Sequence, residues 1–259
     1  MVGDVCRKLE RAKFHADDFN QVWRDFVHSG VYAYTIENEG APAFTIHFRW
    51  KVRSWTPEAT HRFQNLSLIF GDLLSNLRAT LDYLVWQLVL VAGGTPTDQH
   101  AFPCLTDRSK WPSASGRRLG GMDARWRNEI EGVQPYHKRD PEHDLLAVLD
   151  QVNNVNKHRA LPATIVTAEQ FSFPVKLPPA TRVDFNSWLD RPMEDGVEFF
   201  RLALTPPVPE LELGLDVDPP LRVAFSDGLD HSDGWSYTNA DLVRHVEQVV
   251  AIFEPAFSS

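Results

Sequence analysis

The segment from Asn153 to Arg159 brings together several kinds of polar side chain that could do chemistry. Amide, ammonium, imidazole and guanidinium groups can bind an anion or move a proton. At 100° per residue, Asn156 and Arg159 continue the apolar face of the helix predicted from Pro141 onward. A charge on a core-facing stripe is costly unless it is paired. We therefore expect the Arg159 guanidinium to turn inward, toward a carboxylate, carbonyl oxygens or a bound anion.

The partners expected for this helix end lie on a long helix predicted over residues 57–92. Its apolar residues recur at spacings of three and four, and Leu68, Trp86 and Leu90 add an apolar stripe on the opposite side, which predicts burial on both sides. Arg78 precedes Asp82 at i, i+4, the weaker order for a pair within one helix, so we expect them to make tertiary contacts. The predicted polar cluster comprises Asp72, Asn76, Arg78, Asp82, Tyr83, Asn153, Asn156, Lys157, His158 and Arg159.

Two interpretations of this cluster remain open from the sequence. A buried hydrogen-bond network that fixes how the helices dock would use the same residue types as a catalytic or binding site, because both need paired polar groups away from water. His158 points away from the apolar stripe by the same geometry, which is typical of a surface or capping histidine.

A second candidate is an anion-binding loop over residues 113–121, with Arg117 and Arg118 beside glycines. Backbone amides and arginines of such a loop can hold a phosphate, although a solvated loop fits the same residues. The sequence has no Walker A loop, dinucleotide fingerprint or nucleophile elbow. Its ten histidines lack ligand spacing, and its two cysteines form no metal or disulfide framework. We expect neither a metal nor a cofactor.

The remaining periodicity predicts an α+β fold. A helix over 4–28 is followed by a hairpin over 31–53 and by the long central helix, with further helices near 123–131 and 141–159. Residues 94–120 resemble a loop, and short strands are predicted at 163–175, 181–188, 196–204, 210–217 and 221–225. Thr238 and Asp241 predict the cap of a terminal helix. We expect a mainly helical half, 1–162, and a β-rich half, 163–259, joined as one unit.

Charge and hydropathy restrict the partners. The net charge of −9 comes from the second half of the chain, so we do not expect nucleic-acid binding outside a local basic patch in the first half. The longest apolar stretch is too short to span a bilayer, and the first residues lack the apolar core of a signal peptide. We therefore expect a cytoplasmic protein without membrane contact. A homodimer through the long helices stays open.

Two motifs carry a resemblance to a known group of proteins. The run Gly71-Asp-Leu-Leu-Ser-Asn-Leu-Arg-Ala-Thr-Leu-Asp-Tyr83, with the later Asn153-x-x-Asn-Lys-His-Arg159, resembles a bacterial protein family without an assigned activity. A more distant likeness is to HEPN-type helical domains, many of which are RNA-cleaving toxins that use an arginine followed four to six residues later by a histidine. At that spacing from Arg78, position 83 holds a tyrosine in place of the histidine. The arginine–histidine pair of those domains is therefore incomplete in this sequence.

Three functions are consistent with these patterns. The first is a non-catalytic binding or interaction protein with a buried polar cluster. The second is a HEPN-like, metal-independent ribonuclease or toxin-related protein that uses Arg78 with Asn156, His158 and Arg159. The third is a protein that binds a small anionic ligand through Arg159. The sequence leaves open whether the protein is an enzyme.

Overall fold

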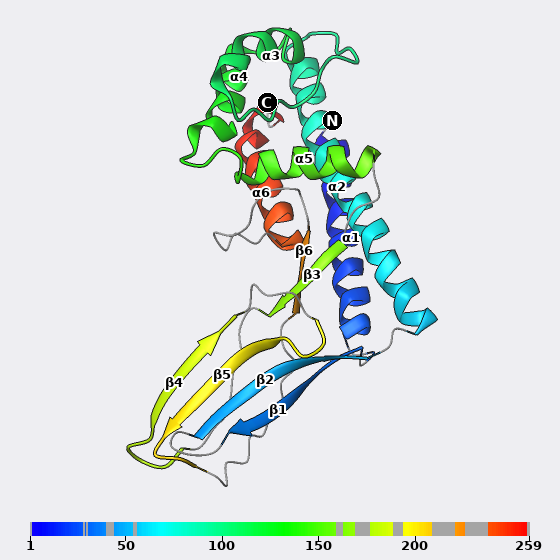
Figure 1. Ribbon diagram of the computed structural model, residues 1–259. Helices are drawn as coiled ribbons and strands as arrows, with labels where there is room; N and C mark the ends of the chain where they lie inside the picture. The colour runs from blue at the N-terminus through cyan, green and yellow to red at the C-terminus, as the bar shows by residue number, and fades with distance from the viewer. Residues whose placement is uncertain are drawn as a thin grey trace. The chain divides into compact units, whose positions relative to one another are not determined.

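The chain is α+β, as predicted. The computed structural model describes residues 2–27, 29, 31–39, 44–53, 56–158, 163–168, 177–188, 194–208, 221–225 and 238–257. The chain divides into two compact units. We call them the helical unit (residues 1–21, 65–162 and 226–259) and the sheet unit (residues 22–64 and 163–225). Figure 1 shows the elements of both units.

The described helices and strands follow the order of the predicted ones. The helices are α1 (Val2–Val27), α2 (Pro57–Val91), α3 (Trp111–Arg118), α4 (Ala124–Gly132), α5 (Leu145–His158) and α6 (Asn239–Ile252). The strands are β1 (Tyr32–Glu39), β2 (Phe44–Val52), β3 (Ala163–Ala168), β4 (Arg182–Ser187), β5 (Glu198–Thr205) and β6 (Leu221–Phe225). The strand predicted at 210–217 lies outside the described residues. None of the described helices combines the length and the apolar character needed to cross a bilayer.

Helices α1 and α2 pack as an antiparallel pair. In the helical unit, the ring of Phe19 lies 5.9 Å from that of Phe70, and Lys8 lies over the ring of Tyr83. The apolar stripe predicted for α2 is confirmed as its core-facing side. Its fully buried residues are Leu66, Phe70, Leu73, Leu74, Leu77, Leu81, Leu84, Val85, Leu88 and Val89. Burying a side chain of this size contributes about 1.5–3 kcal/mol, so this stripe dominates the stability of the helical unit.

The prediction that α2 is buried on both sides is wrong for the described part of the chain. Leu68 is 69% exposed, Trp86 40% and Leu90 38%. The spacing correctly put these residues on one side of the helix. Whether a neighbouring element covers that side is a tertiary property, which periodicity within the helix does not contain.

Two local predictions are also corrected. Residues 111–118, expected within a loop, form α3, because Pro112 sits in its first turn, where a proline is tolerated, and Trp111 and Ala114 are buried beneath it. Helix α5 begins at Leu145 rather than near Pro141, because the Asp144 side chain accepts a hydrogen bond from the Leu146 amide and caps the first turn.

Four antiparallel strands form the main sheet, in the order β1-β2-β5-β4, and β3 pairs with β6 in a second sheet. The hairpin prediction is confirmed, with Tyr32 opposite Val52 and Glu39 opposite Thr45. One face of the main sheet is apolar and buried, as the alternation along β2 predicts. Its buried residues are Phe44, Ile46, Phe48, Trp50, Phe199, Phe200, Leu202 and Leu204.

The units differ from the predicted halves. The hairpin, predicted in the first half, belongs to the sheet unit together with the later strands. Helix α6, predicted in the second half, belongs to the helical unit. A strand buries its edge and its apolar face by pairing with other strands. This requirement places β2 beside β5, about 150 residues later in sequence, and makes both units discontinuous.

The capping box at the start of α6 allows a first test. The Thr238 hydroxyl accepts from the Asp241 amide, and the Asp241 carboxylate accepts from the Thr238 amide. We expect Thr238→Ala to lower the free energy of unfolding by about 1 kcal/mol, measured by urea denaturation. Thr238→Ser keeps the oxygen and serves as the control. Equal stability of the two variants would contradict the role of this cap.

Candidate functional site

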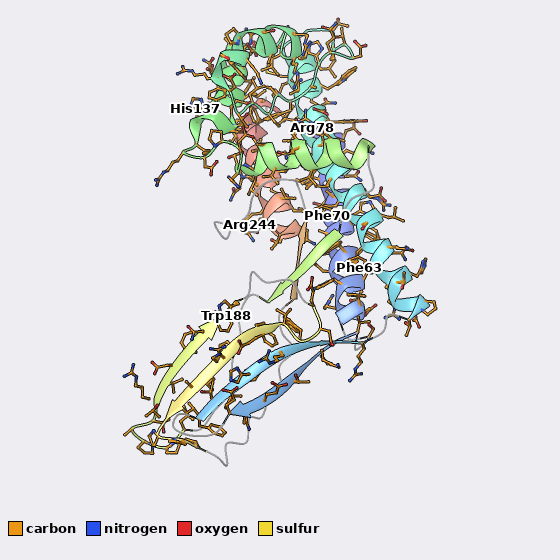
Figure 2. All side chains as sticks on the ribbon, viewed as in Figure 1. Phe63, Phe70, Arg78, His137, Trp188 and Arg244 are labelled. Carbon is orange, nitrogen blue, oxygen red and sulfur yellow. The ribbon has the colours of Figure 1, made fainter. Side chains whose placement is uncertain are left out.

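Arg78 is the centre of a buried polar cluster in the helical unit, where α5 crosses α2 (Figure 2). Its side chain is 9% exposed. Nη2 donates to the Phe102 carbonyl oxygen at 2.5 Å and lies 3.0 Å from the Asp82 carboxylate. Nη1 donates to Cys104 Sγ at 3.1 Å and lies 3.4 Å from the Asp150 carboxylate. We call Arg78, Asp82, Phe102, Cys104 and Asp150 the Arg78 cluster.

The cluster holds residues 102–105 against α2 through hydrogen bonds to Phe102. The Asp82 carboxylate also accepts from the Phe102 amide at 2.9 Å, so Phe102 is held through both its amide and its carbonyl group. A little further on, the Leu105 amide donates to Gln134 Oε1, and the Leu105 carbonyl accepts from the Tyr136 amide. Residues 102–105 belong to no described helix or strand. The side chains of Arg78, Asp82 and Gln134 and the Tyr136 amide bond to their buried peptide groups instead.

One buried cation in the cluster faces two carboxylates. Burial by itself lowers the pKa of Arg78, but Cys104, Asp82 and Asp150 around the guanidinium raise that pKa above its ordinary value. Burial raises the pKa of Cys104 to about 12, although Arg78 opposes this. At neutral pH Cys104 is therefore a neutral thiol that accepts a hydrogen bond, and it lacks the thiolate that a nucleophile needs. The two carboxylates are the charges that compensate Arg78.

The tertiary contacts expected for Arg78 and Asp82 are present, but the rest of the predicted set on α2 is not beside them. Asp72 is exposed, and Asn76 donates back to the Asp72 carbonyl oxygen at 2.8 Å. Tyr83 is 42% exposed, beside Lys8. The inclusion of Asp72, Asn76 and Tyr83 in the cluster is wrong, because they lie around the helix from Arg78, toward its exposed side.

The predicted residues on α5 are only partly described. Asn153 is 1% exposed, and its Oδ1 has no hydrogen-bond partner among the described residues. The side chains of Asn156, Lys157 and His158 and the whole of Arg159 lie outside the described part of the chain. The inward orientation of Arg159 stays a prediction.

Asp150, the contribution of α5 to the cluster, was missed from the sequence. It lies off the apolar face used to predict burial on that helix. The available signal was Leu146 and Ala147, four and three residues earlier, which are both buried beside it. Cys104 and the Phe102 carbonyl carried no signal, because they come from a segment without periodicity.

Arg117 and Arg118 do not sit in a loop. They end α3, where the Leu119 amide bonds to the Ser115 carbonyl oxygen and the helix backbone is internally paired. The carbonyl end of a helix carries a partial negative charge, which disfavours an anion. The amide cradle on which the anion-binding prediction relied is therefore missing between residues 113 and 119, and anion binding by the two side chains stays a prediction.

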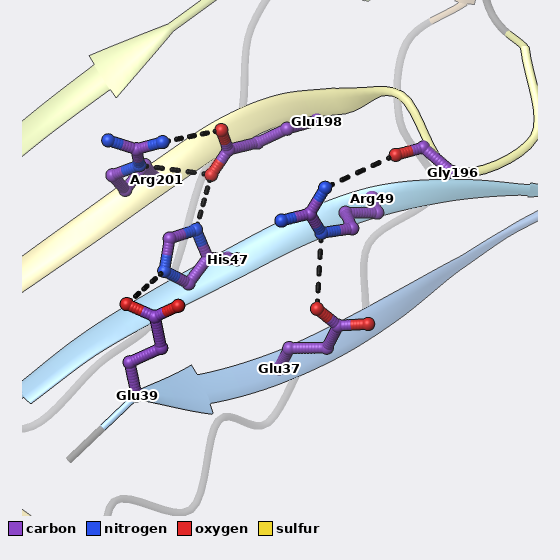
Figure 3. A network of polar contacts seen from close by, with 7 residues as sticks. All are labelled: Glu37, Glu39, His47, Arg49, Gly196, Glu198 and Arg201. Atoms are coloured by element: carbon purple, nitrogen blue, oxygen red, sulfur yellow. Dashed lines mark hydrogen bonds and ion pairs between the residues drawn. The ribbon is translucent and has the colours of Figure 1, made fainter.

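A second polar network, not predicted as a site, lies on the face of the main sheet opposite the apolar one (Figure 3). We call it the sheet network. Its centre is Glu198, whose carboxylate accepts two hydrogen bonds from Arg201, at 3.0 and 2.7 Å, and lies 2.5 Å from His47 Nδ1. The other ring nitrogen of His47, Nε2, is buried and lies 3.5 Å from Glu39, without a hydrogen bond to any residue that the structure describes. Beside it, Arg49 pairs with Glu37 at 3.1 Å.

A β-bulge brings Glu198 onto this face. The register shifts between Phe48, opposite Phe200, and Arg49, opposite Glu198. Without the extra residue Phe199, the strict alternation of β5 would send Glu198 to the apolar face together with Phe200. The shift instead puts Phe199 against Trp50, with ring centroids 4.1 Å apart. The alternation along β5 alone could not reveal this.

The sheet network favours the ionised forms of Glu198 and Arg201. Hydrogen bonds from Arg201, and then from His47, lower the pKa of Glu198 although partial burial opposes this, and the same pairing raises the pKa of Arg201. In the described part of the chain, no three histidine, cysteine or acidic side chains are grouped so that they could hold a metal ion. We interpret the network as cross-strand ion pairing between β1, β2 and β5.

Comparison with known proteins adds no assignment to these two clusters. Neither the family models, nor the curated proteins, nor the solved structures compared with this chain include a match. The interpretation of the Arg78 cluster and the sheet network therefore depends on their own geometry.

The Arg78 cluster predicts a large loss of stability when its cation is removed. Arg78→Ala removes the donor of the buried Phe102 carbonyl and the cation that faces Asp82 and Asp150, and we expect the free energy of unfolding to fall by about 3–5 kcal/mol in urea denaturation. Arg78→Lys keeps the charge but not the fork of donors and should lose less. Arg117→Ala, at an exposed arginine, is the control. Similar stability of all three variants would contradict a structural role for Arg78.

The sheet network predicts a dependence on acid. Because the pKa of Glu198 is lower in the folded protein than its ordinary value of 4.5, the stabilisation is fully present above 4.5. This stabilisation is lost as the pH falls through the pKa that Glu198 has in the folded protein. We expect Glu198→Gln to be less stable than the wild type at pH 7, with a difference that shrinks on acidification, measured by urea denaturation across this range. Glu194→Gln, at an exposed glutamate, is the control. A difference independent of pH would contradict the assignment.

Proposed function

We propose that this protein is a non-catalytic binding or interaction protein in which the Arg78 cluster has a structural role. One observation carries the proposal: protein groups contact both terminal nitrogens of the Arg78 guanidinium. Asp82, Asp150, the Phe102 carbonyl and the Cys104 thiol occupy both terminal nitrogens. A catalytic or ligand-binding arginine needs donors directed at the substrate, and these donors are directed at the protein.

The neighbouring groups support the same conclusion. The Cys104 thiol is protonated at neutral pH, so the cluster offers no nucleophile. The carboxylates of Asp82 and Asp150 both face the Arg78 guanidinium, at 3.0 and 3.4 Å. What the cluster does supply is geometry, since it fixes α5 and residues 102–105 on α2.

An interaction role also explains the exposed side of α2. Large apolar side chains on a surface that is otherwise polar are typical of contact sites for other proteins. Tyr83, Trp86 and Leu90 lie within two turns of one another on α2 and are all exposed. They belong to the helix whose opposite side carries the buried core, so a partner would meet a rigid surface.

RNA cleavage is the test that separates this proposal from a HEPN-like ribonuclease. We expect the pure protein to leave single-stranded and structured RNA intact in the presence of EDTA, because both terminal nitrogens of Arg78 already contact protein groups. The readout is gel analysis of end-labelled RNA at micromolar protein.

Cleavage that is lost in a folded Arg78→Lys variant but kept in Arg117→Ala would overturn the proposal. Circular dichroism of each variant establishes that it is folded. Cleavage that persists equally in both variants would be independent of Arg78. If that activity stayed with the protein through repurification, it would overturn the proposal, and if it separated from the protein, it would belong to a contaminating nuclease.

A further inference from the structure

The exposed side of α2 carries a row of residues whose spacing along the helix is symmetric about its middle. From Leu68 to Leu90 the spacings are four, three, four, four, three and four, which is two 11-residue repeats of a helix-packing seam. We call this row the α2 seam. It consists of Leu68, Asp72, Ser75, Ala79, Tyr83, Trp86 and Leu90, of which all except the partly exposed Ala79 are exposed.

We infer that the α2 seam is a self-association site, on which α2 of a second copy packs antiparallel with its centre at Ala79. The inference deepens the proposed function by naming the partner. In a two-fold dimer each copy uses the same surface, so the surface must be complementary to itself when reversed. The residues of the seam meet this condition.

The ends and the centre of the seam match when the helix is reversed. Leu68 and Leu90 lie equally far from Ala79, so each leucine faces the other leucine of the second copy. This pairing accounts for Leu68, the most exposed of the apolar side chains on α2. Small residues at the centre, Ser75 and Ala79, allow the two backbones to approach closely. The seam is about 33 Å long at 1.5 Å per residue.

Charge selects the antiparallel direction. Reversal places Asp72 of one copy opposite Trp86 of the other, one turn from Tyr83, over whose ring Lys8 lies. The indole N–H of Trp86 and the ammonium group of Lys8 are both donors for that carboxylate. A parallel pair would instead place the two Asp72 carboxylates against each other, and like charges in contact are unfavourable.

Sedimentation analysis over a range of concentrations tests the stoichiometry. We expect a species of twice the 29.5 kDa chain mass. Leu68→Glu and Leu90→Glu should each raise the dimer dissociation constant by about tenfold or more. Val91→Glu, at an exposed position on the same helix but off the seam, should leave it unchanged. Lys8→Glu should weaken the dimer, and adding Asp72→Lys should restore it, because the exchange recreates the pair.

Disulfide trapping tests the direction, in a Cys6→Ser background that removes the exposed native thiol. The double variant Leu68→Cys with Leu90→Cys should form a covalent dimer under mild oxidation, because a disulfide requires α-carbons within about 7 Å. Leu68→Cys alone should not, since the two copies of residue 68 lie at opposite ends of an antiparallel seam. Efficient trapping by the single variant would indicate a parallel pair and overturn the inference.

A protein that stays monomeric at all concentrations would also overturn it. That result would leave the proposed function standing with a different partner on α2. RNA cleavage dependent on Arg78 would have the opposite meaning, because it would remove the proposed function without affecting the dimer. The two failures are therefore distinguishable.

Discussion

The buried guanidinium of Arg78 is the interaction on which the helical unit depends. A cation removed from water must be matched by charge and by hydrogen-bond acceptors, and here they come from α2 itself, from residues 102–104 and from α5. The apolar stripe of α2 provides most of the driving force for packing. The Arg78 cluster determines which segments pack there and in what position, because apolar contacts tolerate sliding and this set of directed contacts does not.

The sheet unit also pairs its charged side chains, and it does so through a β-bulge. Its polar face carries acidic and basic side chains from β1, β2 and β5, and the bulge at Phe199 brings Glu198 into their register. The same bulge adds an aromatic ring to the apolar face, against Trp50. One inserted residue therefore serves both faces of the sheet, which is consistent with a bulge as a specific feature of the strand.

The contrast between the two sides of α2 connects structure to function. One side is occupied by the core and by Arg78, whose donors are used within the protein. The other side presents Leu68, Tyr83, Trp86 and Leu90 to solvent. A helix that is fixed on one side and apolar on the other is suited to bind a partner without rearrangement, because its side chains are already held in place.

The sequence by itself determined the α+β class, the described helices other than α3, the hairpin and the cap at Thr238, because these follow from periodicity and from local hydrogen bonding. It also identified Arg78 and Asp82 as unusual, since charges beside an apolar stripe require partners. Only the tertiary structure decided that the partner on α5 is Asp150, that Glu198 turns to the polar face and that the second apolar side of α2 is exposed. Those outcomes depend on which segments meet in space, and residues far apart in the chain carry no local pattern that specifies their meeting.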